Sequence, residues 1–285
     1  MAGIFWLASY PKSGNTWFRS VLRACLGGAD GLLDINALQT GKIASSRAWV
    51  DDVAGFDTSD LTQAEIENLR PHVYRWSAGQ GTEPAYHKIH DAYRLTGEGQ
   101  PIIDTEATRG AVYIIRNPLD VAPSYAAHNG TGIDRAIDRM GDHDHALSRV
   151  KEALPTQLLQ VMGSWSDHVT SWMDAPGLAL HPVRYEDMLD RPEDTFGQAL
   201  RFLEVDRDAA CIARAVELCR FERLARQERD HGFRERPARA DRFFRSGRAG
   251  GWRDTLSPAQ VARIIADHGA VMARFGYLDA QGNPV

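Results

Sequence analysis

Short apolar runs alternate with longer stretches of helical periodicity along this 285-residue chain. The runs are rich in β-branched and aromatic residues and lie at 4–10, 85–90, 111–116 and 179–185. Helical periodicity marks, among others, residues 158–173, 193–205 and 258–276. Such alternation is typical of βα units around a mainly parallel sheet. The sequence therefore predicts an α/β fold with a central, mainly parallel sheet flanked by helices.

The organisation of the chain favours one domain over residues 1–285. The sequence contains no internal repeat, no low-complexity tract and no Pro/Gly/Ser-rich linker long enough to separate domains. Its length suffices to bury a substantial core. Residues 28–84 and 129–155 are polar, rich in Gly and Asp, and weakly periodic. We expect these two stretches to be excursions from the sheet.

The composition is that of an ordinary soluble globular protein, with 43% hydrophobic and 25% charged residues. A net charge of −5 argues against a nucleic-acid partner, whose binding surface is usually basic. No apolar stretch approaches the length of a membrane span, and the N-terminus lacks a signal-peptide pattern. We therefore expect a cytoplasmic protein without a membrane partner. Three cysteines without metal-type spacing are expected to be reduced core thiols: Cys25, Cys211 and Cys219.

The first apolar run leads into the stretch "YPKSGNTW" at 10–17 and then into a helical pattern. A loop between a buried strand and a helix N-terminus presents unpaired N–H groups and the positive end of the helix dipole. Gly14 allows a close approach of the backbone. The pattern thus predicts a phosphate-binding loop, although a capped turn uses similar residues. The polar side chains of the loop are Lys12, Ser13, Asn15 and Thr16.

A nucleotide kinase would show G-x-x-x-x-G-K-[ST] and a strand ending in Asp that holds magnesium. Here Lys12 precedes the glycine, and the run 111–116 ends in Arg116. The site is therefore expected to bind an anion without a metal. In the stretch that follows, Pro118 can begin a helix, while Arg116 and Ser124 supply a charge and a hydroxyl. A surface ion pair and an ordinary helix hydroxyl are the alternatives for these two side chains.

Five stretches together resemble the soluble sulfotransferases that use 3′-phosphoadenosine 5′-phosphosulfate (PAPS). "YPKSGNTW" resembles their 5′-phosphosulfate-binding loop, and "RNPLDVAPSY" resembles their 3′-phosphate-binding segment. "GSWSDHVTSW", "VRYEDML" and "FRSGRAGGWRD" are similar to further family segments in the same order. The matches span residues 10–254. The N-terminal stretch is also similar to bacterial members that modify phenolic or sugar hydroxyls of natural products.

The resemblance implies a set of PAPS-binding residues. Those expected around the phosphosulfate and the adenine are Lys12, Ser13, Gly14, Asn15, Thr16, Trp17, Tyr185 and Phe221. Those expected at the 3′-phosphate are Arg116, Ser124, Arg245, Ser246 and Gly247, the last three on a lid over 229–254. Ser246 stands where the family commonly has Lys, so Arg248 is an alternative source of that charge. Of the family's T-S-F segment, "CRF" at 219–221 keeps only Phe221.

"YHKIHDAY" at 86–93 resembles the family strand that carries K-T-H, whose histidine is the general base. The match implies His90 as the base, with Lys88 on the same face of the strand. An imidazole with a pKa near ~6.5 can accept a proton from a hydroxyl at neutral pH. His87 lies on the other face and is expected to pack or meet solvent. Lys12 is expected to stabilise the leaving phosphate.

These observations predict an enzyme that transfers a sulfuryl group from PAPS to a hydroxyl of a small molecule. A P-loop-type small-molecule kinase and a non-catalytic nucleotide-binding protein remain alternatives. The acceptor is expected to contact 28–84 and 129–155. A metal at "GDHDHA" (141–146) is disfavoured against a solvated loop, because alternate residues do not fix a tetrahedral site. Residues 253–262 depart from the family's dimer motif, which leaves a monomer and a homodimer open.

Overall fold

The computed structural model describes residues 2–27, 33–38, 40–149 and 154–285. The chain divides into two compact units, each built from three stretches. The first unit is Met1–Tyr10, Thr40–Tyr113 and His143–Pro182, and the second is Pro11–Gln39, Ile114–Asp142 and Val183–Val285. The single domain expected over 1–285 stays a prediction.

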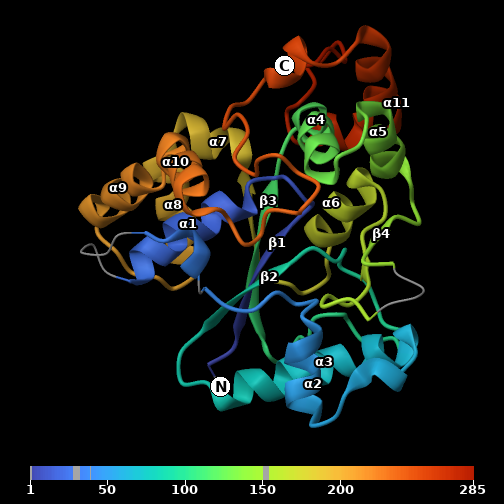
Figure 1. Cartoon of the computed structure of the whole chain (residues 1–285), viewed down its shortest axis with the longest axis vertical. Coiled ribbons are helices and arrows are strands. Elements are labelled where there is room, and N and C mark those ends of the chain that lie inside the picture. The colour runs from blue at the N-terminus through green and yellow to red at the C-terminus, as the bar shows by residue number, and fades with distance from the viewer. Residues whose placement is uncertain (1, 28–32, 39, 150–153) are drawn as a thin grey trace. The chain divides into compact units, whose positions relative to one another are not determined.

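The main sheet has four strands in the order β2-β1-β3-β6. Figure 1 labels three of them, β1, β2 and β3. The four strands are β1 (Ile4–Ser9), β2 (Ala85–Ile89), β3 (Thr108–Ile115) and β6 (Leu180–Arg184). Each lies at an apolar run of the sequence, and the strands form a central parallel sheet flanked by helices. The predicted fold class is confirmed. Crossovers between parallel strands need a dozen or more residues, which is why helical segments separate the strands along the chain.

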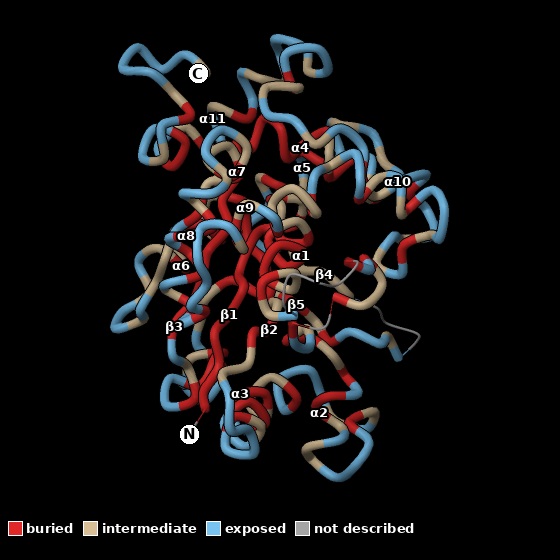
Figure 2. The backbone as a smooth tube through the Cα atoms, turned by 90° about the vertical axis from the view of Figure 1, so that its left-hand side faces the viewer, coloured by how far each residue is buried: buried red, intermediate tan, exposed pale blue. Residues whose placement is uncertain are grey.

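Strand β1 is buried along its whole length (Figure 2). A strand covered on both faces reads as a continuous apolar run, as "IFWLAS" does. It pairs in parallel with β2, with Ala8 opposite Ile89. The two strands therefore end side by side, which brings Ser9 and Tyr10 next to His90.

The first unit also contains α2 (Arg47–Ala54), α3 (Gln63–Gln80), α6 (Trp165–Met173) and an antiparallel pair, β4 (Ala146–Leu147) with β5 (Gln160–Val161). Helix α2 packs on α3. The helix predicted over 158–173 is wrong at its start. It begins only at Trp165, because Gly163 has a φ of 64° and Ser164 caps the first turn.

The second unit holds two helix groups. Helix α1 (Asn15–Leu26) packs on α8 (Pro192–Phe202) and α9 (Ala209–Leu218), and α4 (Pro118–Asn129) packs on α5 (Ile133–Gly141) and α11 (Pro258–Arg274). The remaining α-helices described are α7 (Tyr185–Asp190) and α10 (Phe221–His231), and the 3-10 turns of the chain are Ile35–Ala37, Thr58–Asp60 and Gly251–Asp254.

Three thiols far apart in the sequence gather in the second unit. Cys25 and Cys219 are buried, Cys211 is half-buried, and all three are free, as expected from their spacing. Burial, together with Cys211, raises the pKa of Cys25 to about 12. The thiol of Cys25 therefore stays protonated at neutral pH.

Helices α2, α3 and α5 occupy much of the expected excursions at 28–84 and 129–155. The parts of these excursions at 28–32, 39 and 150–153 lie outside the described residues.

An ion pair stands in the core of the first unit. The guanidinium of Arg70 donates to both carboxylate oxygens of Asp91, at 2.8 and 2.7 Å. The exposed fractions of the two residues are 1% and 0%. Arg70 also donates from Nε to the Tyr74 hydroxyl. A buried pair of this kind requires both partners, since either charge alone would be desolvated without compensation.

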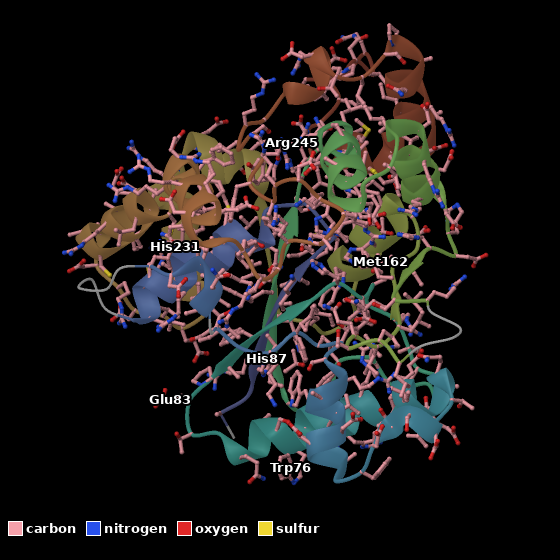
Figure 3. All side chains as sticks on the ribbon, in the orientation of Figure 1. Trp76, Glu83, His87, Met162, His231 and Arg245 are labelled. Carbon is pink, nitrogen blue, oxygen red and sulfur yellow. The ribbon has the colours of Figure 1, made fainter. Side chains whose placement is uncertain are left out.

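Aromatic side chains surround two histidines of this core. Trp165 and Trp172 of α6 are fully buried. His87 packs against Trp49 with ring centroids 4.4 Å apart and ring planes tilted by 39°, and its Nδ1 accepts a hydrogen bond from the backbone N–H of Lys42. Figure 3 labels His87 among the side chains of the chain. Burial lowers the pKa of His87 and that of His168 to about 4.

We expect Asp91→Asn to destabilise the protein by about 3–5 kcal/mol, because Arg70 would keep a buried and poorly compensated charge. Each kcal/mol corresponds to about 2–4 °C in melting temperature for a chain of this size. Asp138→Asn is the control, since Asp138 pairs with Arg263 at 2.6 Å on the surface. That change should cost less than about 1 kcal/mol. Equal melting temperatures for the two variants would contradict the role of the buried pair.

The two buried histidines predict an acid-sensitive fold. Their pKa is about 4 when folded and 6.5 as a model value, so the unfolded chain binds more protons between these limits. Stability is therefore complete above about pH 6.5 and falls as the pH drops toward about 4, by up to about 1.4 kcal/mol per pH unit for each histidine. Urea unfolding across this window should show a shallower pH dependence for His87→Asn, which keeps an acceptor for Lys42. An unchanged slope would show that His87 does not contribute.

Candidate functional site

The loop after β1 has a backbone shape that its glycine makes possible. Lys12 has a φ of 70° and Gly14 a φ of 103°. A Cβ atom at Gly14 would lie 2.6 Å from the ring of Tyr185. The loop therefore requires glycine at position 14 both for its φ and for the close approach of Tyr185.

Ser13 Oγ and Trp17 Nε1 of this stretch are buried without a hydrogen-bond partner among the described residues. Ser13 is only 1% exposed. Helix α1 begins directly after Gly14, and no side chain caps its N-terminus. Buried polar groups are nearly always paired, and a helix N-terminus attracts negative charge. The loop therefore has the donors expected of an anion-binding site.

Arg116 connects this loop to the C-terminal part of the second unit. Its guanidinium donates to the carbonyl oxygens of Lys12 and Arg248, both at 3.1 Å. The same group lies 4.2 Å from the centroid of the Tyr185 ring. Its Nε is buried and has no partner among the described residues. Arg116 is thus held by carbonyls and a ring, and within the described residues no ion pair joins its guanidinium to a carboxylate.

Further positive charge lies close to Arg116. Partial desolvation, with Arg116 and Arg248 nearby, lowers the pKa of Arg245. Arg248 itself forms an ion pair with Asp254 at 2.8 Å. After desolvation, repulsion from Arg116 and Arg248 is the next cause of this lowered pKa, and an anion bound among these cations would relieve that repulsion.

Carboxylates hold the segment that carries Arg245. Glu228 of α10 accepts from the backbone N–H groups of Phe243 and Phe244 at 2.7 and 2.9 Å. Asp120 of α4 accepts from the N–H of Gly250 at 2.7 Å. These bonds fix both ends of the short stretch that the sequence assigns to the 3′-phosphate.

Two aromatic rings lie along the same stretch. The Lys12 ammonium is 3.9 Å from the centroid of the Phe243 ring. The Phe221 ring lies so close to Gly247 that a Cβ there would be 2.3 Å from it. Phe221 and Arg245 also line a pocket of about 480 Å³ formed by residues of α10 and of 232–245.

The structure thus brings together most of the cofactor residues expected in the second unit. Contacts join Lys12, Gly14, Trp17, Arg116 and Tyr185 into one group and Phe221 to Gly247. Asn15 and Thr16 are buried in the first turn of α1. Ser124 is half-buried in α4 and Ser246 is exposed, and no contact in the described part of the chain joins either to this group. The sequence analysis missed Phe243, Glu228 and Asp120, although Asp120 lies inside the motif "RNPLDV".

His90 follows β2 in the first unit and is half-buried. Its Nδ1 lies 2.7 Å from the backbone carbonyl oxygen of Ser9. A carbonyl only accepts, so Nδ1 carries the proton and the lone pair is on Nε2. Lys88 is half-buried on the same face of β2, and His87 is buried on the opposite face, as the period of two predicts.

The described residues contain no group of three or more His, Cys, Asp or Glu side chains that could hold a metal ion. Within "GDHDHA", His143 instead pairs with Asp167 at 2.5 Å. No helix in the described ranges combines the length and the apolar character that crossing a membrane requires.

Comparison with known proteins gives consistent matches. Cytosolic sulfotransferase 13 of Arabidopsis thaliana is 30% identical over 270 residues, which cover 90% of this chain and 73% of the relative. Sulfotransferase 1B1 of Canis lupus familiaris is 25% identical, with 89% and 78% covered. The structure of mouse sulfotransferase SULT7A1 complexed with PAP has the same fold, with a TM-score of 0.60, 18% identity, and 96% and 85% covered. The sulfotransferase domain model matches residues 4–276, and the chain therefore belongs to the sulfotransferase family.

Proposed function

We propose that this sulfotransferase moves a sulfuryl group from PAPS to a hydroxyl of a small-molecule acceptor. The enzyme class follows from the family, whose reaction is PAPS-dependent transfer. The observation that supports PAPS as donor is the guanidinium of Arg116, which bridges two backbone carbonyls beside the further charge of Arg245. Two anion-binding elements in one unit suit a donor with phosphate at both its 5′ and 3′ positions.

The residues of the second unit fit PAPS chemically. Ser13 Oγ and Trp17 Nε1 are unpaired donors in the described structure, and Gly14 has no Cβ that would fill the loop. PAPS supplies the activated sulfuryl group when bound. We propose Lys12 to Trp17 for its phosphosulfate, Tyr185 and Phe221 for its adenine, and Arg116, Ser124, Arg245, Ser246 and Gly247 for its 3′-phosphate. Two structural neighbours, the mouse enzyme and a retinol dehydratase, are complexes with PAP.

His90 is the proposed general base. Its Nδ1 donates to the Ser9 carbonyl, which directs the basic lone pair of Nε2 toward the acceptor hydroxyl. Lys88 adds positive charge on the same strand face, and Lys12 stabilises the phosphate oxygen that leaves. Since Lys and Arg supply this charge, we propose that the reaction needs no divalent metal.

A small-molecule hydroxyl is the proposed acceptor class. Flavonol 3-sulfotransferase of Flaveria bidentis is 21% identical over 272 residues, and a retinol dehydratase structure contains androsterone. Flavonols and androsterone are both small molecules with hydroxyl groups. We propose that 28–84 and 129–155 supply acceptor contacts, that 229–254 forms a lid, and that the protein is cytoplasmic without a nucleic-acid or membrane partner. A monomer and a homodimer both fit this proposal.

We expect His90→Ala and Lys12→Ala each to lower the rate of sulfuryl transfer by at least about 10²-fold, because each removes a preorganised proton acceptor or charge. The assay uses radiolabelled PAPS with a panel of phenols, alcohols and glycosides, in the presence of EDTA. His87→Asn is the matched control. It keeps an acceptor for Lys42 and should stay within about 3-fold of the parent rate, since His87 packs in the core.

Several results would count against this mechanism. A larger loss for His87→Asn than for His90→Ala would show that the base assignment is wrong. Activity that disappears in EDTA and returns with magnesium would show that a metal takes part.

We expect 3′,5′-bisphosphoadenosine to raise the melting temperature far more than 5′-AMP at equal concentration. A ligand at about 100 times its Kd adds about 2.7 kcal/mol to the free energy of unfolding. Arg116→Ala should abolish most of the difference between the two ligands, because it removes a charge-assisted contact to the additional phosphate. The smaller shift with AMP should survive in this variant.

Equal shifts for AMP and the bisphosphate in the parent protein would contradict PAPS as donor. A larger shift with Mg-ATP would favour the kinase alternative instead.

A further inference from the structure

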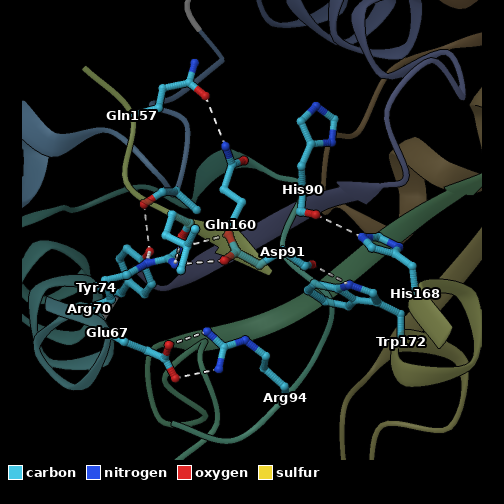
Figure 4. A network of polar contacts seen from close by, with 12 residues as sticks. Glu67, Arg70, Tyr74, His90, Asp91, Arg94, Gln157, Gln160, His168 and Trp172 are labelled. Atoms are coloured by element: carbon cyan, nitrogen blue, oxygen red, sulfur yellow. Dashed lines mark hydrogen bonds and ion pairs between the residues drawn. The ribbon is translucent and has the colours of Figure 1, made fainter. Parts of the chain in front are cut away.

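A closed circuit of hydrogen bonds includes the backbone and the ring of His90 in the first unit. Figure 4 shows one of its bonds, which joins His168 to the backbone oxygen of His90. The circuit starts at the peptide group between Ser9 and Tyr10. Its carbonyl oxygen accepts from His90 Nδ1 at 2.7 Å, and its N–H bonds the hydroxyl of Tyr113. The Tyr113 hydroxyl lies 2.7 Å from Nδ1 of His168, whose Nε2 lies 3.0 Å from the carbonyl oxygen of His90.

We propose that Tyr113 and His168 are positioning residues for the base His90, acting through this circuit on its backbone and through the Ser9–Tyr10 peptide on its ring. The proposal rests on the proposed function, which makes His90 the base. It assigns no contact with substrate to Tyr113 or His168.

The donor and the acceptor of each hydrogen bond in the circuit follow from its backbone carbonyl oxygens, which can only accept. The His90 carbonyl accepts, so Nε2 of His168 carries the proton and its Nδ1 carries a lone pair. Tyr113 must then donate its hydroxyl proton to that lone pair, which leaves its oxygen free to accept from the Tyr10 N–H. The circuit therefore has one consistent arrangement of protons, and it holds His168 in its neutral Nε2–H form.

Burial strengthens this arrangement. His168 and Tyr113 are both 0% exposed. Burial lowers the pKa of His168 to about 4 and raises the pKa of Tyr113 well above its usual value. Neither group changes protonation at neutral pH, so the circuit is intact when His90 acts as a base. Hydrogen bonds in a low-dielectric interior polarise one another, and the Tyr10 N–H makes the Ser9 carbonyl a better acceptor for His90.

Helix α6 places His168 accurately. Ser164 and Asp167 form a capping box that fixes the first turn. One turn after His168, Trp172 donates from Nε1 to the carbonyl oxygen of Asp91 at 3.0 Å. The helix thus holds two consecutive carbonyls, those of His90 and Asp91, and so determines how the chain turns at the end of β2.

Two amide variants of His168 separate positioning from packing. Gln can place its NH₂ group near the position of Nε2 and keep the donor to His90, whereas Asn reaches only the position of Nδ1 and loses that donor. We expect His168→Asn to lower kcat by about 10-fold or more, with the KM for PAPS within about 2-fold, because a small displacement of a reacting group has a large effect. His168→Gln keeps the donor to His90 but loses the acceptor for Tyr113, so its kcat should lie between that of His168→Asn and that of the parent. Equal losses in the two variants would overturn the proposal.

Tyr113→Phe tests the same circuit if both His168 variants prove unstable. It keeps the ring but removes the donor to His168 Nδ1. We expect kcat to fall by about 5-fold with an unchanged KM for PAPS. An unchanged kcat would overturn the proposal.

A spectroscopic measurement is independent of turnover. In ¹⁵N-histidine NMR spectra at alkaline pH, with the His90 signal assigned from His90→Ala, we expect Nδ1 to be protonated and Nε2 to carry the lone pair. In His168→Asn and Tyr113→Phe this single tautomer should give way to a mixture. A His90 that is protonated at Nε2 in the parent, or the same single tautomer in both variants, would overturn the circuit. Full activity of His90→Ala would overturn the proposed base while leaving this measurement valid.

Discussion

The guanidinium of Arg116 is the charge on which the second unit's site depends. Its two terminal nitrogens donate hydrogen bonds to the carbonyl oxygens of Lys12 and Arg248, two residues that lie far apart in the sequence. Because carbonyls solvate a cation without neutralising it, the bonds that organise the loop also leave its charge uncompensated. The proposed 3′-phosphate of PAPS would supply that compensation, so the same side chain would serve both the structure of the loop and the proposed binding.

The carboxylates near Arg116 accept hydrogen bonds from backbone N–H groups and form no direct ion pair with its guanidinium among the described residues. Asp120 accepts from the N–H of Gly250, and Glu186 accepts from the N–H of Asn117 at 3.0 Å. Burial is the main cause that raises the pKa of Glu186. Carboxylates used in this way fix the loops around an anion site and are less available to neutralise its arginines. Their placement explains how an acidic protein can present a local cationic site.

The strands, the loop at 10–17 and the candidate base could be predicted from the sequence, because each is marked by a pattern of neighbouring residues. The period of two separates His87 from His90, and one strand pairing brings His90 to Ser9. Tyr113 and His168 could not be linked in this way, since their contact depends on where α6 packs. Likewise, the contact between Lys12 and Phe243 depends on how the backbone at Phe243 folds, and Glu228 accepts from the N–H of Phe243 there. The roles of Ser124 and Ser246 stay predictions.

Tyr10 and Pro11 explain why "YPK" suits the end of β1. Pro11 has no N–H and its φ is restricted, so the ladder of the strand cannot continue through it. The peptide group between Ser9 and Tyr10 then bonds to side chains of the first unit. Its carbonyl oxygen accepts from Nδ1 of His90, and its N–H donates to the hydroxyl of Tyr113. The next residue, Lys12, already has a positive φ and belongs to the anion loop of the second unit. Three consecutive residues, Tyr10 to Lys12, thus lead from the strand end that contacts His90 into the loop that carries Lys12.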